Sequence, residues 1–182
     1  MKQKPHNNQY HPYFDRYISL VKEGPVFQTL HEQGEEELET FYNISEDMAD
    51  LRYEEGKWSV KEVIGHMADV ERALSYILFA AARGDKPTFT PFDKDQYMKK
   101  SLYTSQNIQK VVLEFVAVRG ATNALLMGVA RDTWQQTALV LDHDTTVRAL
   151  VFIIAGHTQH HLNILKERYG IGASGNETNI IH

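Results

Sequence analysis

The sequence of 182 residues contains no cysteine. This absence excludes disulfides, thiolate metal ligands and cysteine nucleophiles, so histidine, aspartate and glutamate remain for metal binding and proton transfer. Long apolar runs are also lacking, because the longest stretch, ALVFIIAG, is far shorter than the roughly 20 residues needed to cross a bilayer. The sequence therefore predicts no membrane-spanning segment.

An excess of basic residues is lacking as well. Nineteen Lys and Arg stand against 24 Asp and Glu, which gives a net charge of −5 and no basic footprint for nucleic acid. The polar N-terminal segment has no apolar core of a secretory signal, so we expect a cytoplasmic location. The hydrophobic content of 42% is that of a globular protein, and the length predicts one domain over residues 1–182, with residues 1–10 and 171–182 flexible.

Helical periodicity dominates the chain. Five prolines and few alternating β-branched runs favour helices, and only QQTALVLD resembles a strand. In KWSVKEV, Ser59 and Glu62 form a predicted capping box, while Gly84 and Gly170 are predicted helix stops. The expected helices cover residues 13–21, 26–42, 60–83, 95–100, 105–129 and 145–169, the last capped by Asp144 or Thr145.

The helix expected at residues 26–42 has an apolar stripe and an acidic face. Its apolar residues recur at helical intervals, and EQGEEELE is interpreted as a solvated face. The predicted stripe contains Val26, Leu30, Leu38 and Phe41.

Three histidines interrupt the last helix in FIIAGHTQHHLNILKERYG. On a helical wheel, His157 and His161 fall within the buried stripe, and His160 falls at its rim. Residues four apart share one helix face, so both rings can converge on one ion. An unpaired buried imidazole costs up to a few kcal/mol, and either a shared cation or satisfied core hydrogen bonds would remove that cost.

A third metal ligand would come from another helix. His66, in VIGHMADVE, is the only other histidine within a long amphipathic helix, and it lies at the edge of the apolar stripe of that helix. A small rotation of the helix in a bundle would turn it inward. The remaining histidines are expected in solvent: His6, His11, His31, His143 and His182.

At these residues the sequence resembles the DinB/YfiT-like superfamily of metalloenzymes. The similarity lies in WSVKEVIGHMADVERA, in IIAGHTQHHLNILKERYG and in the connection PFDKDQYM. The resemblance implies an all-α, DinB-like four-helix bundle with short additional helices. It also implies a divalent metal ion held by His66, His157 and His161, and a homodimer.

Two other metal sites fit less well. A ferritin-like di-iron bundle needs Glu-x-x-His pairs, but Glu62 precedes His66 by four residues. The helical zinc-protease motif needs a glutamate that HTQHH lacks. Imidazole ligands suit zinc, nickel, iron or copper, and availability in cells overrides affinity; zinc is the expected ion, with nickel or iron next.

A three-histidine site predicts activation of a water or a thiol at the metal. The resemblance implies a hydrolase or a thiol S-transferase that acts on a small molecule, with a low-molecular-weight thiol as a partner. The alternative is a non-enzymatic, metal-stabilised bundle that binds a ligand or a protein.

No catalytic residue is assigned from the sequence. Arg119 is interpreted either as an anion holder or as half of an inter-helix salt bridge, and Trp58 with the aromatic residues of TFTPFDKDQY as pocket wall or core. The candidate general bases are Glu62, Asp69, Glu71 and Asp95.

Overall fold

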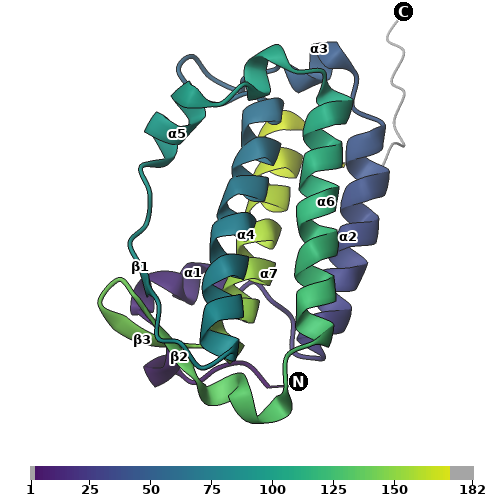
Figure 1. Ribbon diagram of the computed structural model, residues 1–182. Coiled ribbons are helices and arrows are strands. Elements are labelled where there is room, and N and C mark those ends of the chain that lie inside the picture. The colour runs from purple at the N-terminus through teal and green to yellow at the C-terminus, as the bar shows by residue number, and fades with distance from the viewer. Residues whose placement is uncertain (1–2, 173–182) are drawn as a thin grey trace, which may run out of the picture.

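Four long helices dominate the computed structural model, which describes residues 3–172 (Figure 1). They are α2 (Val26–Tyr42), α4 (Val60–Ala82), α6 (Ile108–Met127) and α7 (Val147–Tyr169). Helices α2 and α4 each contact both α6 and α7, so the four helices form a bundle around a common core. The predicted all-α four-helix bundle is therefore confirmed.

Shorter elements lie in the connections. The described chain contains short α-helices α1 (Asp15–Ile18), α3 (Glu46–Ala49) and α5 (Lys94–Lys100), and 3-10 helices at Asn7–Gln9, Pro12–Phe14, Tyr103–Ser105 and Arg131–Gln135. The long connection from α4 to α6 includes α5 and runs along the outside of the bundle beside α4 (Figure 1). This connection brings its residues against the α4 side of the bundle.

A small sheet packs at one end of the bundle. Strand β1 (Thr88–Phe89) pairs in parallel with β2 (Thr137–Val140), which pairs antiparallel with β3 (His143–Thr146). The predicted strand QQTALVLD supplies β2. Leu141 and Asp142, both with positive φ, form the two-residue turn to β3, as in a type I′ hairpin.

This hairpin corrects the predicted start of α7. Asp144 and Thr145 pair with β2 and cannot cap the helix, and Thr146 takes that role by accepting a hydrogen bond from the Ala149 amide. At α4, the predicted capping box is confirmed: Ser59 Oγ accepts from the Glu62 amide, and Glu62 Oε2 accepts from the Ser59 amide.

The other helix limits agree in part with the sequence. Gly170 ends α7 with a φ of +71°, as predicted. The helix expected from residue 105 begins at Ile108 instead, because Asn107 caps it. The helix expected at 13–21 is α-helical only over Asp15–Ile18. Within the segment expected to be flexible, Tyr10 is buried in the core; residues 173–182 lie outside the described residues.

A layer of polar side chains crosses the bundle between two apolar clusters. Along each long helix, buried polar residues separate the apolar residues of one cluster from those of the other. These polar residues are Gln33 and Glu37 on α2, Glu71 on α4, Arg119 and Thr122 on α6, and His157, Thr158 and His161 on α7. Because buried polar groups need partners, this layer is where the bundle requires specific pairing.

The predicted stripe on α2 is wrong at one position. Leu38 is 42% exposed, whereas Glu37, placed by sequence on a solvated face, is completely buried. The helix turns Glu37 inward because α6 offers it a partner, the Arg119 guanidinium, 3.4 Å away. A tertiary contact with Arg119 has overridden the local apolar pattern.

Glycine is needed where α1 crosses α7. A Cβ at Gly156 would overlap the backbone of Tyr17, including its carbonyl oxygen. The missing side chain lets α1 approach closely, and the Tyr17 ring then lies 5.3 Å from the His157 ring between centroids. Gly156 thus sets the position of one wall beside the buried histidines.

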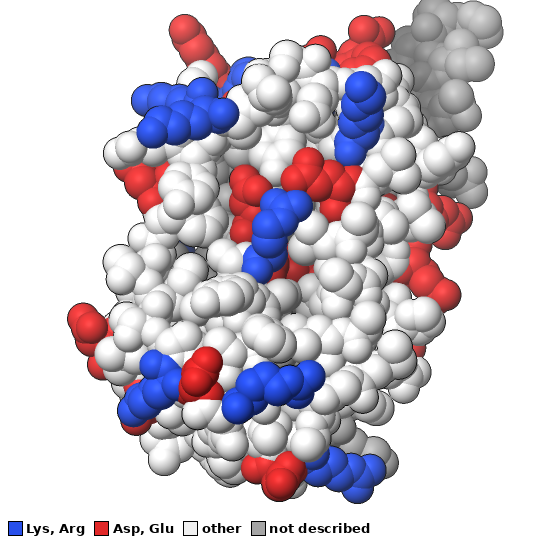
Figure 2. All heavy atoms as spheres, viewed as in Figure 1, with Lys and Arg blue, Asp and Glu red and all other residues white. Residues whose placement is uncertain are grey.

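The surface drawn in Figure 2 carries basic and acidic side chains close together, and neither sign forms a broad patch there. Among the described residues, no helix combines the length and the apolar character needed to span a membrane.

Candidate metal centre

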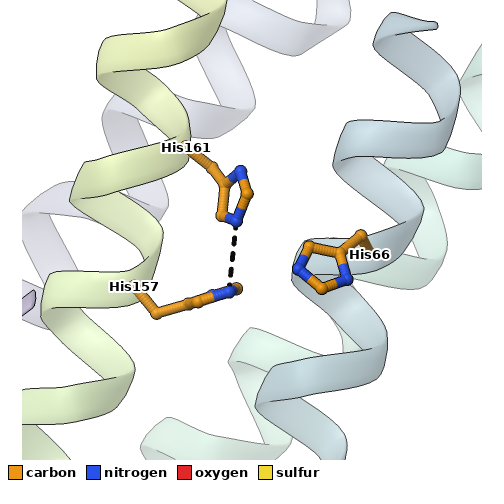
Figure 3. A group of neighbouring side chains, drawn as sticks. All are labelled: His66, His157 and His161. Carbon is orange, nitrogen blue, oxygen red and sulfur yellow. Dashed lines mark hydrogen bonds between the residues drawn. The ribbon is translucent and has the colours of Figure 1, made fainter. Parts of the chain in front are cut away.

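The three predicted histidines lie together in the bundle, and we call them the histidine trio: His66, His157 and His161. His66 projects from α4 toward the two α7 rings (Figure 3). Each ring offers a nitrogen, and these nitrogens all lie within 4.8 Å of one another. All three residues are buried, with 6–9% of their surface exposed.

The helices position the trio by simple geometry. His157 and His161 are one turn apart on α7, and their Nε2 atoms lie 3.2 Å apart. The His66 ring centroid lies 5.2 Å from that of His157 and 5.0 Å from that of His161. The predicted inward rotation of His66 is thus observed. His160 lies half-buried against the Tyr17 ring, 5.4 Å between centroids, outside the trio.

The environment keeps the trio neutral. Burial, followed by the charge of Lys94, lowers the pKa of His66 to about 4. Burial, followed by the neighbouring imidazoles, holds the pKa values of His157 and His161 well below the ordinary value of histidine. Neutral imidazole is the form that binds a metal ion, so the rings need lose no proton at neutral pH.

Protein groups leave part of the trio unsatisfied. The Nε2 atoms of His157 and His161 share one hydrogen bond, in which one nitrogen donates and the other accepts. His161 Nδ1 is buried without a partner among the described residues. A buried polar group left unpaired costs about 1–3 kcal/mol. Three converging neutral imidazoles are thus stabilised by a cation better than by one another.

Aromatic side chains surround the trio. The Trp58 ring lies 4.9 Å from the His66 ring between centroids. Trp58 also contacts Lys94, whose Nζ lies 4.5 Å from the centroid of the Trp58 ring. Trp58 lines a pocket here, as the sequence interpretation allowed. Lys94 and Tyr17 were not singled out from the sequence, because only the paths of α5 and α1 in the folded chain bring them to the trio.

Two pockets open beside the trio. A pocket of about 340 Å³, here called the apolar pocket, reaches His66 and His157. Its other walls are Tyr13, Phe14, Tyr17, Val70, Leu74, Phe89, Pro91, Phe92, Lys94, Leu141 and Ile153. A pocket of about 520 Å³, here called the basic pocket, reaches His66 and His161, and its charged walls are Arg16, Lys57, Lys94 and Asp95. Both volumes suit small molecules.

Three of the four candidate general bases are engaged elsewhere. Glu62 completes the capping box and pairs with Arg52 at 2.7 Å. Asp69 accepts from the Tyr103 hydroxyl at 2.9 Å. Glu71 pairs with Arg119 at 2.7 Å. Asp95 alone of the four lines a pocket that reaches the trio.

Arg119 forms a salt bridge and does not reach either pocket. Its Nε and Nη2 atoms donate to the Glu71 carboxylate at 2.7–3.1 Å, and Nη2 also donates to Thr158 Oγ1 at 2.8 Å. Nη1 donates to Glu37 at 3.4 Å. The anion-holder interpretation of Arg119 is therefore wrong, and its guanidinium instead joins all four long helices.

Glu37 is the uncommon member of this cluster. Burial, opposed by Arg119 and reinforced by Glu71 and Glu36, raises the pKa of Glu37 to about 8. One carboxylate oxygen, Oε1, has no partner among the described residues. Because Glu71 takes the closer contacts of Arg119, Glu37 is held protonated at neutral pH.

We expect Glu37→Gln to reduce the loss of stability as pH rises. The pKa of Glu37 is higher in the folded protein than in the unfolded chain, so the Glu37 carboxyl stabilises the fold most at low pH. That stabilisation is lost as pH rises through 8. Between pH 6.5 and 9 the wild type should lose about 2 kcal/mol more unfolding free energy than the variant, measured by urea denaturation. The control is Glu36→Gln, an exposed neighbour. Parallel pH profiles for wild type and Glu37→Gln would contradict the raised pKa.

The fold and the trio define a class: helical bundles with a buried three-histidine group between two helices. A family model, the DinB superfamily, matches residues 29–165. The chain therefore belongs to the DinB superfamily, as the resemblance implied. No match was found among curated protein sequences.

Two solved structures share the fold. YfiT from Bacillus subtilis, described as a probable metal-dependent hydrolase with an unusual four-helix bundle topology, has a TM-score of 0.67 and 18% identity, over 93% of this chain and 95% of that one. A mycothiol-dependent maleylpyruvate isomerase has a TM-score of 0.65 and 11% identity, over 80% of this chain and 60% of that one. At these identities the likeness concerns the fold.

Proposed function

We propose that His66, His157 and His161 bind one divalent metal ion and that the protein is a metal-dependent enzyme acting on a small molecule. One observation carries this proposal: three buried neutral imidazoles from two helices bring their nitrogens within 4.8 Å of one another. Zinc is the expected ion, with nickel or iron next, because nitrogen ligands suit these metals and the chain has no thiolate.

The reaction is hydrolysis or the transfer of a low-molecular-weight thiol. When bound, the ion supplies Lewis acidity, which lowers the pKa of a water or thiol and makes it a nucleophile at neutral pH. The descriptions of the two similar structures, a probable hydrolase and a thiol-dependent isomerase, support these two branches. The cytoplasmic location and the homodimer stay predictions.

The chain's own groups fit this chemistry. The trio lies where two pockets meet, so a small molecule can reach it from solvent. Asp95, on the basic pocket, is the carboxylate available to accept a proton, and its partner Lys94 lies 3.1 Å away. The apolar pocket offers aromatic and aliphatic walls to the rest of such a molecule.

An activity assay tests the proposal. Zinc-loaded protein, purified without an affinity tag, is incubated with monobromobimane and single thiols, and separately with p-nitrophenyl acetate. We expect adduct formation or ester hydrolysis at least about tenfold faster than with His161→Ala. Equal rates would contradict the enzymatic proposal. A zinc-loaded bundle without turnover on any substrate would favour the alternative of a ligand-binding bundle.

A further inference from the structure

The two pockets differ in chemical character although they meet at the same residues. Tyr13, Tyr17, His66 and Lys94 line both of them. His157 faces the apolar pocket, and His161 faces the basic one. A ligand at the trio therefore meets one apolar and one polar environment.

The apolar pocket is built for a hydrocarbon body. Phe14, Phe89 and Phe92 contribute aromatic walls, and Lys94 alone is charged among the described residues that line the pocket. Burial of apolar surface is favourable, so this space favours an aromatic or branched apolar group. Its volume of about 340 Å³ limits that group to the size of a small molecule.

The basic pocket carries an excess of positive charge. Three cations, Arg16, Lys57 and Lys94, line it against one carboxylate, Asp95, in a protein whose net charge is −5. Arg16 stacks over the Tyr13 ring at 4.4 Å and forms no ion pair with any described residue. A local cationic pocket in an acidic protein attracts anions.

We propose that the ligand of the trio is a small anion with an aromatic or branched apolar body: the body occupies the apolar pocket, and Lys94, between the pockets, holds the anionic group. This inference rests on the proposed function and names its substrate class. Lys94 is suited to the role because its side chain is 57% exposed and its ammonium lies over Trp58, beside the trio. Its pairing with Asp95 is a surface ion pair, which a ligand anion can replace at small cost.

Tryptophan fluorescence gives a direct binding test. The chain has two tryptophans, so Trp134→Phe leaves Trp58, beside Lys94, as the single reporter. The zinc-loaded protein is titrated with phenylacetate, with phenylacetamide, which keeps the body without the charge, and with acetate, which keeps the charge without the body. We expect phenylacetate to bind at least about tenfold more tightly than either.

Two lysine variants locate the anion. Lys94→Gln should weaken phenylacetate binding about tenfold and leave phenylacetamide binding unchanged. Lys99→Gln, on the same helix but lining neither pocket, should bind phenylacetate as the parent does. Equal affinity for acetate and phenylacetate, or an unchanged affinity in Lys94→Gln, would overturn the inference.

Metal analysis of the same samples separates the two proposals. If zinc is bound but the Lys94 comparison fails, the ligand inference is wrong and the metal site stands. If the chain takes up no zinc, the proposed function is wrong, and the same titrations of metal-free protein decide whether the two pockets and Lys94 select an apolar anion.

Discussion

His161→Ala is expected to abolish stoichiometric zinc binding. Two imidazoles from the trio would remain, and a structural or catalytic zinc site in proteins uses at least three protein ligands. Loss of a residue that only hydrogen-bonds to a metal ligand weakens metal binding about 10–100-fold. Loss of a ligand itself should therefore weaken it at least about hundredfold. The measurement is the metal content per chain of tag-free protein by mass spectrometry, followed by competition with a chelator.

His160→Ala is the matched control for this experiment. It removes a histidine from the same helix, adjacent in sequence, that lies against Tyr17 outside the trio. We expect it to bind zinc as the wild type does. Equal metal content in the wild type and His161→Ala would refute the site, and equal losses in both alanine variants would indicate a general effect on α7.

The sequence predicted the α7 half of the trio because helical periodicity is local. His157 and His161 are four residues apart on a stripe that must face the core, so their burial follows from the helix alone. His66 is different: its position at the edge of a stripe depends on how α4 rotates against α7. Only the packing of the two helices decides that rotation.

The positions of residues that depend on contacts between distant segments could not be predicted from the sequence. Lys94 and Tyr17 reach the trio from α5 and α1, whose paths over the bundle are set by tertiary contacts. The close approach of α1 to α7 depends on Gly156. The sequence alone does not show that the Tyr17 backbone packs against this glycine. Likewise Glu37 has the character of a surface residue in its own segment, and its burial follows from the distant Arg119.

The polar layer has a structural consequence for the trio. Arg119 donates to Thr158, the residue that follows His157 on α7, and its other contacts reach α4 and α2. Buried hydrogen bonds of charged groups are strong and directional, so this guanidinium fixes how the helices align. The register of α7 against α4, on which the trio depends, is therefore set by packing and by this ionic contact together.

Arg119→Ala should destabilise the fold strongly. The side chain of Glu71 is 2% exposed, and without the guanidinium its carboxylate would be buried with no counter-charge. Removal of one partner of a buried ion pair costs about 3–5 kcal/mol. The Thr158 hydroxyl would lose its partner as well. Urea denaturation of metal-free protein at pH 7 measures the change.

The chain offers a surface pair for comparison. Arg72, with a side chain 51% exposed, pairs with Glu114 at 2.8 Å, and Arg72→Ala should cost at most about 1 kcal/mol. The double variant Arg119→Met, Glu71→Leu removes both buried charges and should recover much of the stability that Arg119→Ala loses, because it leaves no isolated carboxylate. If Arg119→Ala and Arg72→Ala lost equal stability, the buried pairing would not hold the helices, and apolar packing alone would have to set the register of α7.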